Sequence, residues 1–327
     1  MSDVEDDVRA AYRWVLGREA DEGGLAHYAA AIRSGELTLP ALRRIFLDSD
    51  EFGGRKPGYV TVDIAHSVKV VVDPGEPEFG RYIVGGGSWE PHIIAAIRSN
   101  LPVGGTFIDI GGNVGVMSLQ AAQAVGPQGK VIAFEPNWRN VDAFRRGIVA
   151  NNFENVILYP LALSDRRQII GLTATSNAKV IGESTALQIG DIVQAIPADE
   201  ILEHENRIDL VKIDVEGFEL PVLKGMERSL RRHQPRILCE FNPLCLRAQG
   251  HIEPDILADY LFGLSSTGEL VEHDGSRTPV RSARELMDLW QRRDAEAAAK
   301  GILPAGWVHF DILLDMADDT SRKRNDG

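Results

Sequence analysis

A short apolar segment followed by a glycine-rich turn carries the most specific chemical signal in this sequence. Residues 107–115 read FIDIGGNVG, in which Gly111 and Gly115 flank Asn113. Glycine lets a ligand approach the backbone closely, and asparagine tolerates a tight turn while it offers a polar contact. Because ligands bind beyond the carboxyl ends of strands in an open parallel sheet, we predict that this turn contacts a ligand.

The spacing of these residues distinguishes between two ligands. A dinucleotide favours the pattern G-x-G-x-x-G, whose backbone N–H groups face a pyrophosphate. This turn reads D-x-G-x-N-x-G instead. Asp109 would repel a pyrophosphate, but its carboxylate would complement the sulfonium and ammonium groups of S-adenosylmethionine, directly or through water. The sequence therefore predicts S-adenosylmethionine as the cofactor, with an NAD-dependent Rossmann oxidoreductase as an alternative.

Two further segments offer contacts for the nucleoside part of this cofactor. Glu135 ends the apolar segment KVIAFE, 26 positions after Asp109, which leaves room for one helix and one strand between them. A carboxylate at a neighbouring strand end can accept hydrogen bonds from both ribose hydroxyls. The next segment ends in PLALSD, where Leu163 could pack on the adenine and Ser164 could contact its edge.

Carboxylates also lie at the ends of the fourth and fifth strands expected within IDLVKIDVEGFE and RILCEF. Asp214, Glu216 and Glu240 are therefore expected at adjacent strand ends. An alcohol is a poor nucleophile, so methyl transfer to a hydroxyl needs a general base or a metal. Asp214 is the first candidate for the base, with Glu216 or Glu240 assisting. The same carboxylates could instead bind Mg²⁺, and the sequence does not choose between these roles.

The elements that must position these residues alternate along the chain. From Thr106 to Phe241, short apolar segments alternate with helical patterns, which predicts a parallel sheet with helices on both faces. The segment WVHFDILLDM is expected to add an antiparallel strand at the sheet edge. The predicted fold class is α/β, with a doubly wound, Rossmann-like sheet of seven strands that is mostly parallel.

The chain is expected to form two domains. Apolar residues at helical spacing in residues 1–53, such as Val8, Tyr12 and Leu16, predict a small all-helical domain. A linker leads to the domain of residues 59–317, whose first part, 59–88, has a strand-like pattern. Residues 318–327 are polar and are predicted to form a flexible tail.

Composition and charge restrict the location and the partners. The chain has 327 residues and a net charge of −13, which disfavours nucleic acid as a partner, since phosphate binding needs a basic surface. Cys239 and Cys245 are the two cysteines, and they are expected to be reduced thiols. No signal-peptide pattern or long apolar segment is present, so a cytoplasmic location is expected. No pattern indicates the oligomeric state.

Five motifs in order along the chain resemble the FkbM-type family of S-adenosylmethionine-dependent methyltransferases. They are FIDIGGNVGVMSL, AFEPNWRN, LALSD, IDLVKIDVEGFELPVLKG and RILCEFNP, and the resemblance covers about residues 89–242. It implies transfer of a methyl group to a hydroxyl of a sugar, a polyketide or a related metabolite. Gly112 stands where the family usually has alanine.

The resemblance also implies a role for each matching residue. The methionine end of the cofactor would be framed by Asp109, Gly111, Asn113 and Gly115. The ribose would be held by Glu135, with Pro136 beside it among the cofactor-binding residues, and the adenine would be bordered by Ala162, Leu163 and Ser164. Asp214 and Glu216 would face the reaction centre. The family often has an acidic residue shortly before the first strand, and Glu90 could meet the methionine amino group from there.

The N-terminal region has a resemblance of its own. The segments YRWVLGREADEGGLAHY and DSDEF are similar to a small helical domain of unassigned function that recurs in bacterial proteins linked to cell-surface and secreted polymers. This association favours a sugar, glycan or glycolipid hydroxyl as the acceptor, a role in polysaccharide biosynthesis, and a protein partner for the N-terminal domain. The second alternative is a non-catalytic scaffold in the same process.

Overall fold

The computed structural model divides the chain into two compact units, Met1–Gly58 and Tyr59–Gly327. The structure describes residues 4–12, 16, 18–38, 41–42, 45–46, 49, 51, 58–74, 76, 79–86, 88–173, 180–181 and 189–316. The tail predicted over residues 318–327 and most of the predicted linker therefore lie outside the described residues.

The N-terminal unit contains helices α1 (Val4–Ala11) and α2 (Glu22–Ser34). Asp21 is the N-cap residue of α2, since its side chain accepts a hydrogen bond of 2.8 Å from the backbone N–H of Gly24. Gly35 follows α2 with a φ of 80°, a left-handed conformation that suits glycine. The unit has a small core of its own, formed by Val8, Ala11, Tyr12, Leu16, Ala29, Leu42 and Phe46.

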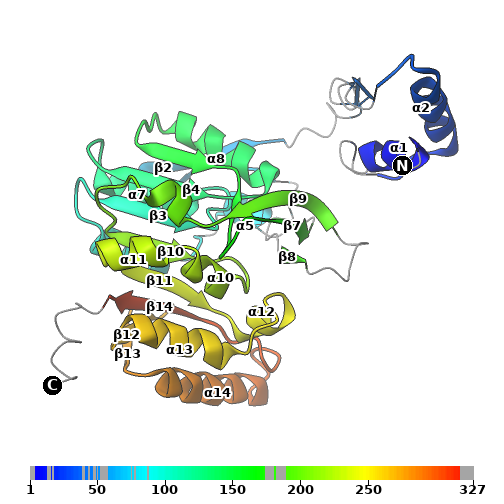
Figure 1. The fold of residues 1–327 in the computed structure, drawn as a ribbon. Helices are drawn as coiled ribbons and strands as arrows, with labels where there is room; N and C mark the ends of the chain where they lie inside the picture. The colour runs from blue at the N-terminus through cyan, green and yellow to red at the C-terminus, as the bar shows by residue number, and fades with distance from the viewer. Residues whose placement is uncertain are drawn as a thin grey trace. The chain divides into compact units, whose positions relative to one another are not determined.

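The second unit is built on one large sheet (Figure 1). Its strands are β3 (Thr106–Ile110), β4 (Lys130–Phe134), β5 (Val156–Tyr159), β10 (Leu210–Ile213), β11 (Arg236–Phe241), β12 (Gly268–Val271), β13 (Arg277–Val280) and β14 (Phe310–Asp315). Their order across the sheet is β13-β12-β14-β11-β10-β3-β4-β5. The five strands from β11 to β5 are parallel to one another, whereas β14, β12 and β13 are joined by antiparallel pairs. The predicted open, mostly parallel α/β sheet is confirmed at this level.

Two details of the predicted sheet are wrong. The sheet has eight strands instead of seven, and the antiparallel strand β14 lies between β11 and β12 instead of at the edge. Ile312 and Leu314 contact one hydrophobic core, and Leu313 on the opposite face contacts the other. A strand that is apolar on both faces buries more surface inside a sheet than at its edge, which explains this position. The hairpin of β12 and β13 forms the edge.

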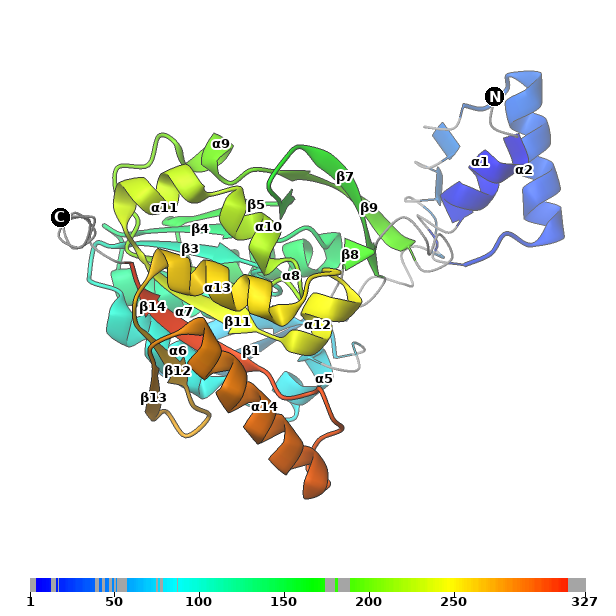
Figure 2. The ribbon, with the colours of Figure 1, turned by 60° about the horizontal axis from the view of Figure 1, so that its bottom comes forward.

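Each strand of the sheet divides its side chains between two cores, because successive residues point to opposite faces. In β3, Phe107 joins the core against helices α5 (Phe79–Val84), α6 (Pro91–Asn100), α7 (Val116–Val125) and α8 (Trp138–Ala150). Ile108 joins the core against α9 (Asp199–Leu202), α10 (Glu219–Lys224), α11 (Glu227–His233), α12 (Pro243–Ala248), α13 (Pro254–Leu264) and α14 (Ala283–Ala299). Figures 1 and 2 show these helices on both sides of the sheet. The arrangement is the doubly wound one that the sequence predicts.

A hairpin precedes this sheet. The alternating valines of residues 60–72 form β1 (Val60–Ile64) and β2 (Val68–Val72), which pair antiparallel. Buried valines of β2 join the core around α7 and α8. Asn151, just after α8, fixes the hairpin, since its side chain both donates to the carbonyl oxygen of Lys69 (2.6 Å) and accepts from its N–H (2.8 Å).

A second, smaller sheet follows β5, and the sequence analysis did not predict it. It contains β6 (Ala162–Leu163), β7 (Gln168–Thr173), β8 (Val180–Ile181) and β9 (Ile189–Ile196), in the order β6-β9-β7-β8. Pro160 separates β5 from β6, because proline lacks the N–H that would continue the ladder. Figure 2 shows β7 and β9 extending beyond the ends of the large sheet.

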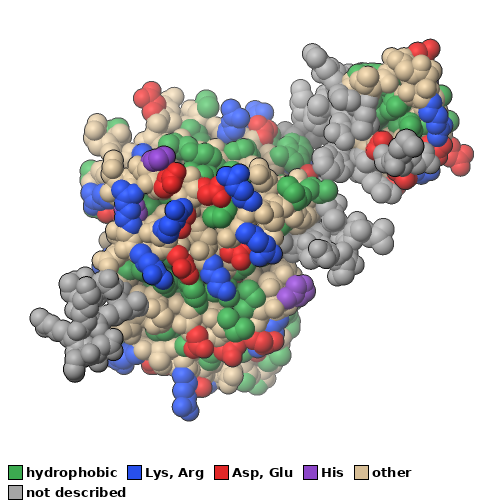
Figure 3. Space-filling model, in the orientation of Figure 1, with side chains coloured by type: hydrophobic (Ala, Val, Ile, Leu, Met, Phe, Trp, Pro, Cys, Tyr) green, Lys and Arg blue, Asp and Glu red, His purple; other side chains and the backbone are tan. Residues whose placement is uncertain are grey.

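On the face in Figure 3, acidic and basic side chains of the α/β unit are interspersed. Within the described part of the chain, we find no helix that is both long enough and apolar enough to cross a lipid bilayer. Cys239 and Cys245 are both buried, and they do not form a disulfide with each other.

Candidate active site

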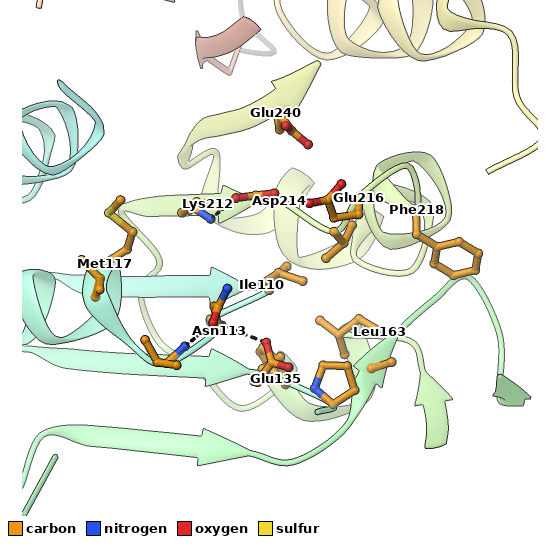
Figure 4. Close-up of a pocket in the computed structure, with 18 of the residues that line it drawn as sticks. Ile110, Asn113, Met117, Glu135, Leu163, Lys212, Asp214, Glu216, Phe218 and Glu240 are labelled. Carbon is orange, nitrogen blue, oxygen red and sulfur yellow. Dashed lines mark hydrogen bonds and ion pairs between the residues drawn. The ribbon is translucent and has the colours of Figure 1, made fainter. Parts of the chain in front are cut away.

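A cavity of about 350 Å³ lies at the carboxyl ends of β3, β4, β10 and β11 (Figure 4). Most of the predicted site residues line it: Glu90, Gly111, Asn113, Glu135, Pro136, Ala162, Leu163, Asp214, Glu216 and Glu240. Three predicted residues, Asp109, Gly115 and Ser164, do not. The parallel sheet thus brings together side chains that are up to 150 positions apart in the sequence, from Glu90 to Glu240.

The glycine-rich turn lies directly against the end of β10. Gly111 has a φ of +83°, and a Cβ atom added to it would be 1.9 Å from the carbonyl oxygen of Asp214. The N–H groups of Gly111 and Gly112 both donate to the carbonyl oxygen of Phe134, at 3.0 Å each, which ties the turn to β4. Gly111 is therefore required both by its conformation and by the close approach of β10.

Comparison of Gly111→Ala with Gly112→Ala tests whether glycine is required at position 111 in particular or whether any substitution in the turn lowers the free energy of unfolding. At Gly112, an added Cβ would meet the ring of Phe144 at 3.2 Å, with no left-handed φ, so alanine should fit after a small shift. We expect Gly112→Ala to change the free energy of unfolding by less than about 1 kcal/mol, and Gly111→Ala to lower it by about 3 kcal/mol or more. Urea denaturation measures both, and equal effects would contradict this account of the turn.

Glu135 is fixed in one orientation at the end of β4. Its two carboxylate oxygens accept 2.8 Å hydrogen bonds from backbone N–H groups, Oε2 from Asn113 and Oε1 from Asn137 (Figure 4 shows the first). Burial raises the pKa of this carboxyl to about 7, although these hydrogen bonds and one from Asn140 oppose the rise. Each oxygen can accept a further hydrogen bond, so Glu135 faces the cavity with two acceptors at a fixed spacing.

Asp109 is completely buried and is not among the residues that line the cavity, so its predicted contact with a cationic cofactor, directly or through water, stays a prediction. Strand alternation turns its side chain toward α7, where Oδ2 accepts a 2.6 Å hydrogen bond from the hydroxyl of Ser118. On the adjacent strand, Lys212 is the register partner of Asp109. Asp109 therefore contributes its charge from beneath the site, next to Lys212.

Lys212 is a functional candidate that the sequence analysis missed. Its side chain is 7% exposed, lines the cavity, and places Nζ 3.0 Å from Oδ2 of Asp214. Burial opposes its charge, but the carboxylates of Asp214, Asp109 and Glu90 outweigh burial and raise the pKa of Lys212. A lysine in a strand next to two acidic residues was the available signal, because a buried lysine needs such partners.

Gly115 and Ser164 support the site without lining it. Gly115 begins α7 with a φ of +93°, and the ring of Phe144 occupies the space where its Cβ would be. The hydroxyl of Ser164 is fully buried and accepts a 2.7 Å hydrogen bond from the side chain of Gln168. Ser164 is therefore engaged within the fold and is not among the lining residues, and its predicted contact with adenine stays a prediction.

The far end of the cavity is strongly acidic. Glu216 follows β10 with a left-handed φ of 55°, and its Oε2 lies 3.1 Å from the thiol of Cys245, which donates to it. Glu240, at the end of β11, accepts a 3.3 Å hydrogen bond from the Asn242 side chain on Oε1. Burial, and then the charges of neighbouring carboxylates with Asp214 first among them, raise the pKa of Glu240 well above its usual range.

Glu90 enters the cavity from the start of α6. It has a φ of 41°, and Pro91 follows it at the first helical position, so the chain turns sharply there. Burial, followed by the charges of Asp214 and Asp311, raises the pKa of Glu90 to about 7. The predicted acidic residue before the first core strand is thus placed beside Asp214 and Lys212.

Apolar side chains complete the lining, and the sequence analysis did not assign them to the site. They are Phe79, Trp89, Ile110, Val114, Val116, Met117, Phe134, Leu161, Ile170, Leu172, Val215 and Phe218. Ile170 and Leu172 come from β7 of the unpredicted small sheet, so no sequence signal could have placed them here. Among the described residues, no group of three or more His, Cys, Asp or Glu side chains is arranged to hold a metal ion.

The fold and this site define a class of protein. An open α/β sheet with a glycine-rich turn after one central strand and a carboxylate after the next is typical of nucleoside-binding Rossmann-like domains. Residues 109–261 match the family model described as the methyltransferase FkbM domain. This match supports the assignment of the α/β unit to the FkbM family of methyltransferases.

Similar proteins bear the name methyltransferase as well. Methyltransferase 1 of Beauveria bassiana is 26% identical over 145 residues, covering 37% of this chain and 58% of that protein. Methyltransferase sdnD of Sordaria araneosa is 27% identical over 166 residues, covering 40% of this chain and 64% of that protein. The chain thus spans less than two thirds of either relative. The crystal structure of methyltransferase FkbM from Methylobacillus flagellatus KT is 16% identical, with a TM-score of 0.34, and covers 78% of this chain and 56% of that one.

Proposed function

We propose that the α/β unit transfers the methyl group of S-adenosylmethionine to a hydroxyl of a sugar, a glycan, a glycolipid or a related metabolite. The observation that carries this proposal is the composition of one cavity, which has the oriented carboxylate of Glu135 at one end and the cluster of Asp214, Glu216 and Glu240 at the other. A nucleoside with a cationic sulfur matches this distribution of charge.

The proposed cofactor position follows the cavity from strand to strand. Glu135 accepts hydrogen bonds from the two ribose hydroxyls. The adenine is bordered by Leu163, Ala162 and Pro136. The methionine part lies over the turn at Gly111, with its ammonium group toward Glu90. The sulfonium then lies near the end of β10, where the ion pair of Asp214 and Lys212 is found. The fit does not require Mg²⁺.

The charge of the acceptor end favours a neutral acceptor. It is lined by Asp214, Glu216 and Glu240. Among the lining residues, Lys212 supplies the positive charge that opposes these carboxylates. Carboxylates, phosphates and sulfates on an acceptor would be repelled by this surplus of negative charge. A neutral hydroxyl would not be repelled, and this supports a sugar hydroxyl over an acidic group. We also propose that the N-terminal unit, which has its own core, docks on a protein partner.

Ligand-dependent melting tests the cofactor part of this proposal. S-adenosylhomocysteine, the product without the methyl group, should stabilise the protein by about 2.7 kcal/mol at one hundred times its dissociation constant. NAD at the same concentration should leave the melting temperature unchanged, because the turn lacks a cradle for a pyrophosphate. If NAD stabilises the protein and S-adenosylhomocysteine does not, the result would contradict the proposed methyltransferase and favour an NAD-dependent oxidoreductase.

Formation of S-adenosylhomocysteine from S-adenosylmethionine tests the acceptor part. Glycans extracted from the parent cell and separated by charge provide the acceptors, and the neutral fraction should support the reaction while the anionic fraction does not. Because the proposed reaction does not use a metal, addition of a chelator should leave the rate unchanged. A loss of rate would show that a metal assists. Binding of the cofactor without turnover on any fraction would instead favour a non-catalytic scaffold.

A further inference from the structure

The carboxylates at the ends of β10 and β11 have unlike surroundings. Oδ2 of Asp214 is engaged by Nζ of Lys212 at 3.0 Å, and Lys212 is itself held between Asp214 and Asp109. The charge of Asp214 is therefore matched by a buried ammonium group. Figure 4 shows this pair on β10, beside the glycine-rich turn.

Glu240 lacks such a partner. Its Oε1 accepts only the long hydrogen bond from the Asn242 amide, and its buried Oε2 has no hydrogen-bond partner in the described part of the chain. Carboxylates on three other elements act on its charge: Asp214 and Glu216 at the end of β10, Glu219 on α10, and Asp311 on β14. His309 is a further titratable group in the cavity lining. No ion pair of Glu240 is found among the described residues.

We propose that Glu240 is the base that accepts the proton of the acceptor hydroxyl, while Asp214, held by Lys212, faces the methyl sulfonium. This inference rests on the proposed function. The acceptor oxygen attacks the methyl carbon, the bond from carbon to sulfur breaks, and its electron pair stays on sulfur as the thioether. The hydroxyl proton moves to the carboxylate of Glu240 and leaves to solvent after the products depart.

The two environments suit these two roles. A base works best when its proton affinity lies near the working pH, and two carboxyls with contrasting surroundings often divide the roles of acid–base group and electrostatic partner. Burial and the surrounding carboxylates raise the pKa of Glu240, so that it binds a proton at a higher pH than an ordinary glutamate. Asp214 differs from Glu240 in that Lys212 already donates a hydrogen bond to one of its oxygens, which suits it to an electrostatic role.

Arrival of the cofactor should prepare this base. The sulfonium brings a positive charge into the acidic end of the cavity, which lowers the proton affinity of Glu240 and releases its proton. S-adenosylhomocysteine has the same ammonium, carboxylate and nucleoside but a neutral sulfur. The difference in proton release between the two ligands therefore reports the groups that face the sulfonium, and contacts common to both ligands cancel.

Isothermal titration calorimetry in buffers of different ionisation enthalpy measures these protons. Above the ordinary carboxyl range of pH, we expect S-adenosylmethionine to release more protons than S-adenosylhomocysteine, by on the order of half a proton at the maximum. Glu240→Gln should abolish this difference. Glu90→Gln should preserve it, because Glu90 is placed at the ammonium group that both ligands carry. Glu253→Gln, the same change at an exposed residue, serves as the neutral control.

The outcomes separate this inference from the proposal on which it rests. Failure of the wild-type protein to bind either ligand would remove the proposed function. Normal binding of S-adenosylhomocysteine by Glu240→Gln shows that the variant is folded, and an undiminished difference in proton release would then overturn the role of Glu240. If the difference in proton release between the two ligands is lost in Glu90→Gln but kept in Glu240→Gln, Glu90 and not Glu240 would be the group that responds to the sulfonium.

Discussion

Glu135→Gln should weaken the binding of S-adenosylhomocysteine by about 100-fold or more. A hydrogen bond to a charged group contributes about 1.5–3 kcal/mol, and the ribose offers two donors to this carboxylate. Glutamine keeps the size of the side chain but turns one of the two oxygens into an amide N–H₂ group. That group would face either the N–H of Asn113 or that of Asn137, both of which now donate to Glu135. The substitution thus removes an acceptor and leaves a backbone donor unpaired.

Calorimetric titration of the variant measures this loss directly. Glu154→Gln is the matched control, because Glu154 is exposed and precedes β5 at the opposite end of the strands. It should bind the ligand as the wild type does. If Glu135→Gln binds S-adenosylhomocysteine within threefold of the wild type, then the ribose does not lie at the end of β4.

The sequence allowed the central sheet to be predicted because its strands are buried on both faces. Such strands appear as short, nearly continuous apolar runs, and RILCEF coincides with β11 from Arg236 to Phe241. A carboxylate at the end of such a run lies at the strand end, which is why Glu135, directly after β4, and Glu240, the last but one residue of β11, could be assigned to the cavity. The small sheet of β6 to β9 could not be predicted, since two of its strands, β6 and β8, have only two residues each and the four strands pair out of sequence order.

The limits of prediction within the site have a different physical origin. The glycine pattern specifies a turn, but the face toward which Asp109 points depends on strand alternation relative to the neighbouring helix. Because Asp109 turns toward Ser118, its charge acts on Lys212, and its side chain is not among those that line the cavity. Register between β3 and β10, which pairs Asp109 with Lys212, is a property of the folded sheet and not of either segment alone.

Replacement of Asp214 and replacement of Glu240 should affect catalysis in different ways. Asp214→Asn leaves the ammonium group of Lys212 without its nearest partner, beside the position proposed for the sulfonium. We expect this variant to bind S-adenosylmethionine at least about tenfold more weakly, a change of about 1.4 kcal/mol, and to bind the neutral S-adenosylhomocysteine with a much smaller loss. Glu240→Gln should bind both ligands nearly as the wild type does at acidic pH, where Glu240 carries a proton.

Turnover shows the role of Glu240 most directly. With the neutral glycan fraction as the acceptor, Glu240→Gln should lower kcat by about 10²- to 10⁴-fold, the usual contribution of a general base. Because the pKa of Glu240 is raised, the wild-type rate should increase with pH above the ordinary carboxyl range, as the group loses its proton. That increase should be absent from the residual rate of Glu240→Gln. A variant that is slow but keeps the wild-type pH profile would show that Glu240 positions the acceptor while another group removes the proton.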